Sequence, residues 1–267
     1  MQASEDNIKL VERFGAQPIS SVQTPDFYTF NNDLFHSHRD FDKFLKALEA
    51  GEPCALVSGV NASGTLHLGH KAVFDTNLYF QKKYNIPIYV PISDDESYVA
   101  GKVETQAQGR EFAYKLAKEM LAYGFDPTKT FFIIDQVYTN IYNNAILLSK
   151  KVTLSEVVAT YGYKPEDNPG LYFYPAVQAA HILYPQMEKN IPHVLVIIGP
   201  DEDSHIRLGR DMASRIGVTK PSILHAKFLP GLDNEKMSKS RNNAIFLNDD
   251  ETSVRKKAMK SFSGGQA

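Results

Sequence analysis

Cysteine is almost missing from this chain, since Cys54 is the only one in 267 residues. A single cysteine excludes an intrachain disulfide and an all-cysteine zinc site, and it is typical of proteins in a reducing cytoplasm. Charge of one sign is missing too, because 29 Lys and Arg face 31 Asp and Glu, for a formal net charge of -2. Any contact with nucleic acid must therefore come from a local basic patch.

Long hydrophobic runs and a leader segment are also missing. Residues 1–10 have no apolar core flanked by positive charge, so we expect no signal peptide. No stretch approaches the roughly 20 apolar residues that span a bilayer, so we expect no membrane partner and a cytoplasmic location. The hydrophobic content of 43% is enough for one large domain, or for one domain that carries an insertion.

Short apolar runs alternate with amphipathic stretches after Gly51. The helical stretches span 70–84 and 110–123, and in the second of these Phe112, Leu116 and Met120 share one face. This alternation predicts an α/β fold, a Rossmann-like doubly wound parallel sheet. The expected buried strands are Cys54 to Val60, Ile86 to Ile92, Thr130 to Asp135, His193 to Ile198 and Ile223 to Ala226.

We divide the chain into two parts. Residues 1–50 read as an N-terminal helical extension, with helices at 8–14 and 41–50 joined by a Pro/Ser/Thr-rich link. Residues 51–267 read as the Rossmann-like domain, and the long helical stretch at about 138–189 reads as an insertion between its two halves. Such sheets bind ligands at the carboxyl ends of their strands, so motifs found there are the first candidates for function.

The first such motif is SGTLHLGH at 63–70, directly after the first strand. A helix N-terminus offers free backbone N–H groups to an anion, and Gly69 leaves room for a nucleotide. His67 and His70 add donors on one face of the turn. The motif predicts a phosphate site without a Walker lysine. Two plain surface histidines remain the alternative, and a zinc site is disfavoured because no third ligand is near.

The second motif is KMSKS at 236–240, in a loop introduced by Pro230, Gly231 and Asp233. Two lysines on either side of a serine can close over a triphosphate and neutralise charge on departing pyrophosphate. Alone, such a run is usually a solvated loop. We expect the two motifs to meet, because both follow strands of the same sheet.

Together these motifs carry a family resemblance. SGTLHLGH resembles the HIGH signature and KMSKS matches the second signature of class I aminoacyl-tRNA synthetases. The chain is also similar, over nearly its whole length, to the archaeal and eukaryotic type of tryptophanyl-tRNA synthetase. The segments that carry this likeness are 38–43, 49–53, 91–96, 125–131, 175–180 and 261–265.

The resemblance implies activation of an amino acid by ATP with Mg²⁺, and transfer to tRNA. The ionised carboxylate can attack the α-phosphorus without a general base, so catalysis is positioning plus charge stabilisation. No structural metal is expected. The implied catalytic residues are His67, His70, Lys236 and Lys239, and the implied ATP-binding residues are Gly59, Ser63, Thr65, His67, Gly69, His70, Met237 and Ser238.

The family's amino-acid pocket maps onto Val57, Pro91, Glu96, Gln178 and Glu202. Glu96 and Gln178 match family residues and imply contact with the substrate's amino group. Val57 and Pro91 stand where the family has a tyrosine and a glutamine that meet the indole N–H, and Glu202 replaces a glutamine. Loss of such polar partners weakens discrimination, so tryptophan must be selected by shape or by other residues.

Several readings stay open at this point. Asp94, Asp95 and Glu96 could simply cap a helix, and Tyr172 to Tyr174 could be core rather than pocket wall. Besides tryptophan-tRNA ligase, we consider a tyrosyl-tRNA synthetase, a stand-alone paralogue for another amino acid, and a non-catalytic regulatory nucleotide-binding protein. The family further implies a homodimer formed through the insertion, and a C-terminal anticodon-binding domain that we expect this chain to lack.

Overall fold

A computed structural model describes residues 9–235, 237, 241 and 243–262 of the chain. Within these ranges, no helix combines the length and the apolar character that a membrane span needs.

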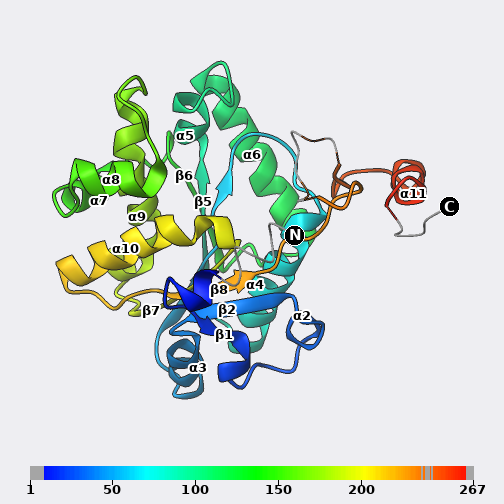
Figure 1. Ribbon diagram of the computed structural model, residues 1–267, viewed down its shortest axis with the longest axis horizontal. Coiled ribbons are helices and arrows are strands. Elements are labelled where there is room, and N and C mark those ends of the chain that lie inside the picture. The colour runs from blue at the N-terminus through cyan, green and yellow to red at the C-terminus, as the bar shows by residue number, and fades with distance from the viewer. Residues whose placement is uncertain (1–8, 236, 238–240, 242, 263–267) are drawn as a thin grey trace.

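One eight-stranded sheet forms the centre of the molecule (Figure 1). The strand order is β1-β2-β8-β7-β3-β5-β4, and β6 pairs with β5. The pairs β3 with β5, β3 with β7, β5 with β6 and β7 with β8 are parallel, which confirms the predicted parallel sheet. The strands are β1 (Gln17–Pro18), β2 (Phe35–Arg39), β3 (Cys54–Val57), β4 (Val60–Asn61), β5 (Ile88–Ser93), β6 (Thr130–Ile134), β7 (His193–Ile198) and β8 (Ser222–Ala226).

Helices cover both faces of the sheet, as a doubly wound fold requires. One apolar cluster packs α3, α4 and α6 against one face, and a second packs α7, α9 and α10 against the other. The α-helices are α2 (Tyr28–Asn31), α3 (Phe41–Glu49), α4 (Lys71–Tyr84), α5 (Asp94–Val99), α6 (Gln106–Tyr123), α7 (Ile141–Ser149), α8 (Leu154–Tyr161), α9 (Pro169–Lys189), α10 (Asp203–Ile216) and α11 (Glu251–Met259).

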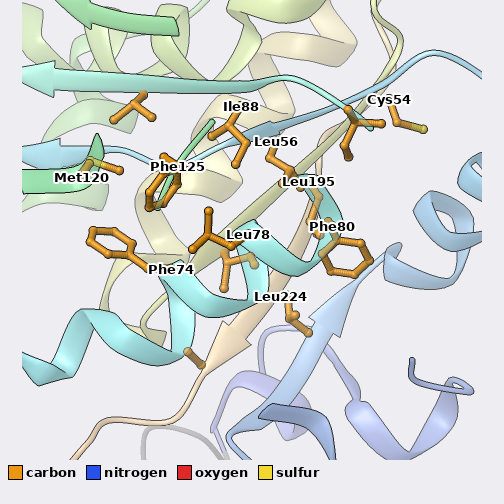
Figure 2. Packing of buried hydrophobic residues seen from close by; sticks show 14 of the residues in the cluster. Cys54, Leu56, Phe74, Leu78, Phe80, Ile88, Met120, Phe125, Leu195 and Leu224 are labelled. Carbon is orange, nitrogen blue, oxygen red and sulfur yellow. The ribbon is translucent and has the colours of Figure 1, made fainter. Parts of the chain in front are cut away.

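Figure 2 shows the first of these clusters. Phe74, Leu78 and Phe80 of α4 lie beneath the strand residues Leu56 and Ile88. The rings of Phe74 and Phe125 meet edge to face, with their centroids 5.4 Å apart and an interplanar angle of 89°. Burial of these rings fixes α4 on the sheet, and α4 carries the first motif at its N-terminal end.

Three helices, α7, α8 and α9, lie between β6 and β7, in the stretch for which an insertion is predicted. Helix α9 begins at Pro169 and contains Pro175 and Pro185. It packs against α7 and α10, and its apolar residues Ala176, Val177 and Ala180 are buried. The insertion thus forms a wall above the face of the sheet that carries Val57 and Val196.

The reading of residues 1–50 as helices and a link was incomplete. Residues 9–12 are helical and α3 is present, but β1 and β2 also lie in this part of the chain. Strand β2 pairs antiparallel with β8 at the edge of the parallel sheet. Its sequence FHSHR does not look like a buried strand, because it contains polar residues. Their burial is possible because they form hydrogen bonds, such as that between Ser37 Oγ and His225 Nδ1 at 3.0 Å.

Candidate active site

A cavity of about 510 Å³ opens at the carboxyl ends of the parallel strands. Val57 of β3, Pro91 of β5, Ile198 of β7 and Ala226 of β8 line it. Doubly wound sheets bind their ligands at this edge. The cavity includes the ends of the neighbouring parallel strands β3 and β7, between which the order of strands in the sheet reverses.

The first motif forms a tight turn between β4 and α4. His67 Nδ1 accepts a hydrogen bond from the Gly69 backbone N–H at 3.1 Å, and the two imidazoles of His67 and His70 lie 4.3 Å apart. A side chain at Gly69 would place its Cβ 2.7 Å from the His67 ring, so the turn needs glycine. The turn holds both rings against the cavity, directly before the N-terminus of α4.

The segment just after the second motif pairs with the first motif. Leu68 N–H donates to Ile245 O at 3.0 Å, and Leu247 N–H donates to Leu66 O at 2.9 Å. The Met237 sulfur lies 3.9 Å from the position of a Cβ at Gly69. Lys236, Ser238 and Lys239 lie outside the described residues, so their predicted contacts with ATP stay predictions.

Glu96 of α5 lies on the wall of the cavity beside two partners. Its carboxylate accepts from Lys102 Nζ at 2.8 and 2.9 Å and from the Asn61 side-chain amide. The Glu96 side chain is 12% exposed, so its charge is largely removed from water and is balanced by Lys102. Such a carboxylate suits a substrate ammonium group.

Gln178 of α9 faces the same cavity, beside polar side chains from the end of α8 and the start of α10. Tyr161 O–H donates to Gln178 Oε1 at 2.5 Å, while Gln178 Nε2 lies 3.5 Å from Glu202 Oε2. The ring of His205 stacks on Tyr161 with centroids 4.0 Å apart, and its Nδ1 lies 3.2 Å from Glu202. The partly buried amide of Gln178 therefore has partners inside the cavity, which agrees with a binding role.

The structure brings together most of the residues predicted for the site. Those that line the cavity are Val57, Gly59, His67, Gly69, His70, Pro91, Glu96, Gln178, Glu202 and Met237. Ser63 and Thr65 are partly exposed and are not part of its lining. Val57 is 2% exposed and packs in the apolar cluster below α9, so it contributes shape and no hydrogen bond.

A buried group of acids lies behind this wall. Asp94, Asp95 and Asp135 place carboxylate oxygens within 4.8 Å of one another. Burial raises the pKa of Asp95 to about 7 and that of Asp135 to about 8. The negative charge of Asp135 adds to the rise in the pKa of Asp95, because like charges disfavour ionisation of both. Asp135 Oδ1 lies 2.6 Å from Nε2 of His181.

This pair predicts a loss of stability at alkaline pH. A carboxyl whose pKa is raised by folding stabilises the fold at low pH, and that contribution is lost as the pH rises through the folded pKa. We expect the melting temperature to fall between pH 6 and pH 9, and to fall less in Asp135→Asn, which cannot ionise. Calorimetry at both pH values measures this, and an equal fall in the two proteins would contradict it.

Sequence reasoning missed several residues of the cavity: Asn61, Lys102, Tyr161, Tyr163, His181 and His205. One signal could have found His181, because it follows Gln178 by three residues on an otherwise apolar helix. The tyrosines gave no such signal. They reach the cavity only through the way α8 and its following loop fold over α9.

Comparisons with known proteins agree with this geometry. The profile of the family described as "tRNA synthetases class I (W and Y)" matches residues 49–267. The tryptophan--tRNA ligases of Methanocaldococcus jannaschii and Sulfurisphaera tokodaii are 37% and 38% identical over 98% of this chain, which covers 73% and 71% of their lengths. A crystal structure of tryptophanyl-tRNA synthetase from Aeropyrum pernix K1 superposes with a TM-score of 0.90 at 33% identity, covering 98% of this chain and 75% of that one.

Proposed function

Because the chain belongs to the class I tRNA synthetases of the tryptophan and tyrosine family, we propose that it is an enzyme that activates L-tryptophan with ATP and transfers it to tRNA. The observation that carries the proposal is that the segment just after the second signature, at Ile245 and Leu247, pairs with the first signature, whose His67 and His70 line the cavity. The similarity to tryptophan--tRNA ligases over 98% of the chain supports tryptophan over tyrosine.

In this proposal the chain catalyses adenylate formation by positioning and by charge. The substrate carboxylate attacks the α-phosphorus of ATP, and the bond from that phosphorus to the bridging oxygen breaks, which releases pyrophosphate. His67 and His70 stand at the N-terminus of α4, where donors and the helix dipole stabilise phosphate oxygens. No group needs to remove a proton from the carboxylate, because it is ionised at neutral pH.

We place Mg²⁺ on the phosphates of ATP. This ion keeps several waters and is commonly held by substrate phosphates and few carboxylates. In the described part of the chain, one group of acids has the spacing of a cation site, Asp94, Asp95 and Asp135. Asp94 and Asp135 are enclosed, and none of the three lines the cavity. The proposal therefore assigns the ion no protein ligand.

Glu96 and Gln178 are proposed to hold the substrate's amino group. Gln178→Ala is expected to weaken binding of tryptophan by about 1–3 kcal/mol, because a buried polar group of the substrate loses its partner. The melting temperature should barely move, since Gln178 is only partly buried and lies outside the apolar clusters. Calorimetric titration measures the affinity. Unfolding of the variant with unchanged affinity in the folded fraction would make Gln178 a structural residue.

We further propose a homodimer formed through the insertion. In its helices α7 and α8, Ile146 is 61% exposed, Leu147 is 49% exposed and Leu154 is 65% exposed. Large apolar side chains exposed together are typical of a surface that a partner covers. Ile146→Asp is expected to convert the dimer into a monomer in sedimentation velocity, because it buries an unpaired charge. Lys150→Asp, directly after the end of α7, serves as a control, and an unaltered dimer in both variants would show that this surface is not the interface.

The proposal has three further parts. The division at residue 51, with an insertion at about 138–189, follows the sequence pattern and the family match from residue 49. The cytoplasmic location rests on the single cysteine.

Contact with tRNA is proposed for α11 and the residue that follows it, where Arg255, Lys256 and Lys260 are exposed. Such contacts to phosphates should weaken steeply as salt rises, which binding at two ionic strengths measures.

Mass spectrometry tests the substrate directly. The protein is incubated with ATP, Mg²⁺ and an equal mixture of the twenty amino acids, and the bound adenylate is identified by its mass. We expect the adenylate of tryptophan. The adenylate of tyrosine would favour the tyrosyl rival, that of another amino acid would favour a paralogue, and no adenylate would favour a non-catalytic nucleotide-binding protein.

A further inference from the structure

One polar side chain in the amino-acid part of the cavity has no role in the mechanism above. His181 of α9 lines the cavity and is only 3% exposed. It lies on the same face of α9 as Tyr174 and Gln178, which precede it by seven and three residues. The same cavity is lined by Val57 and Pro91, whose side chains cannot form hydrogen bonds.

The two ring nitrogens of His181 face different surroundings. Nε2 lies 2.6 Å from Asp135 Oδ1, and Asp135 is fully enclosed and does not line the cavity. Nε2 therefore points behind the wall. In the described part of the chain Nδ1 makes no hydrogen bond, and it is not one of the enclosed polar atoms that lack a partner. Nδ1 is thus the nitrogen that faces the cavity.

The surroundings of the ring also fix its proton. Burial lowers the pKa of His181 to about 4, so the ring is neutral and carries one proton. At 2.6 Å, Asp135 Oδ1 accepts a hydrogen bond from Nε2–H, the usual arrangement of a carboxylate that orients a histidine. A neutral imidazole with Nε2–H presents Nδ1 as an acceptor.

We infer that His181 determines specificity, with Nδ1 accepting a hydrogen bond from an N–H or O–H at the end of an aromatic substrate side chain. The inference rests on the proposed function, because it concerns the same cavity. His181 would supply the hydrogen bond to the substrate side chain that Val57 and Pro91 cannot make. Asp135 acts as a positioning residue, since it holds the tautomer and touches no substrate.

Paired substrates test this. The specificity constant for pyrophosphate exchange is measured with tryptophan and with its benzothienyl analogue, in which sulfur replaces the ring N–H. We expect the unaltered protein to prefer tryptophan by about 10- to 100-fold, the range for a buried acceptor left unpaired. His181→Phe keeps a ring but has no acceptor, and its preference should fall to within about threefold. Gln178→Ala is the control, because it should weaken both substrates alike and keep the preference.

Each outcome decides between the two proposals. Exchange with tryptophan and the analogue at equal efficiency in the unaltered protein overturns the inference and leaves the proposed function standing. No exchange with any amino acid overturns the proposed function itself. Preference for tyrosine over phenylalanine that is lost in His181→Phe supports the inference with a phenol as the donor.

A second variant covers the case in which His181→Phe fails to fold. Asp135→Asn preserves the side-chain shape but can donate to Nε2 as well as accept from it. It is expected to reduce the preference for tryptophan over the analogue while affinity for the analogue stays the same, as calorimetric titration can show. An unchanged preference in this folded variant would overturn the role of Asp135 in holding the tautomer.

Discussion

The variant His67→Asn is expected to form the adenylate about 100 to 1,000 times more slowly than the unaltered chain, the usual cost of losing one preorganised donor at developing charge. The asparagine amide occupies the place of Nδ1 and can still accept from Gly69 N–H, a bond of 3.1 Å in the unaltered chain. The outer part of the ring, which lines the cavity beside His70, is lost. The turn should therefore survive while the phosphate contact does not.

Single-turnover formation of the adenylate measures this loss, because product release does not limit it. The melting temperature should stay the same, since His67 is only half buried. His193→Asn is a matched control: His193 begins β7, at the end of the sheet away from the cavity. Equal rates in the two variants would remove His67 from the catalytic machinery.

Asp203→Ala is expected to destabilise the fold by about 3–5 kcal/mol, the cost of breaking a buried ion pair by removing one partner. Asp203 is 2% exposed at the start of α10. It accepts from Arg39 Nε and Nη2 at 2.8 and 2.9 Å, and its Oδ1 lies 2.9 Å from His225 Nε2. The variant leaves the charge of Arg39 buried without its partner. It also removes the hydrogen bonds that link α10 to β2 and β8.

Urea denaturation measures this difference, with Asp211→Ala on the exposed side of α10 as the control. Hydrogen bonds from His225 and Arg39 hold the pKa of Asp203 well below its usual range. A carboxyl with a lowered pKa contributes stability above its unfolded pKa of about 3.9, and this is lost as the pH falls further. The unaltered chain should therefore lose stability on acidification more steeply than Asp203→Ala. A difference below 1 kcal/mol between the two alanine variants would contradict the role of Asp203.

The parallel core of the fold could be predicted because its strands are continuous apolar runs. Strand β7 begins and ends at the predicted residues, and β3, β5, β6 and β8 lie within a few residues of theirs. Helix α6 begins four residues earlier than its apolar pattern, since the Thr105 side chain caps it by accepting from Gln108 N–H. Such caps are local, and they are easily missed when only periodicity is followed.

The site was predictable where a motif fixes the local backbone, and less so where it depends on packing. The turn at His67 and Gly69 is set by adjacent residues, so its position followed from the sequence. Tyr161 and His181 reach the cavity from the insertion, and their roles depend on how α8 and α9 lie over the sheet. Asp135 looked like the end of a strand, and only the structure places its carboxyl on His181.

Pyrophosphate exchange with each amino acid in turn tests the central claim most directly. The purified chain is given ATP, Mg²⁺, labelled pyrophosphate and one amino acid, and incorporation of label into ATP is followed. We predict exchange that depends on tryptophan, with His67→Asn reduced at least about 100-fold under the same conditions. A folded chain that binds ATP but supports exchange with none of the twenty amino acids would contradict the claim that this cavity activates an amino acid.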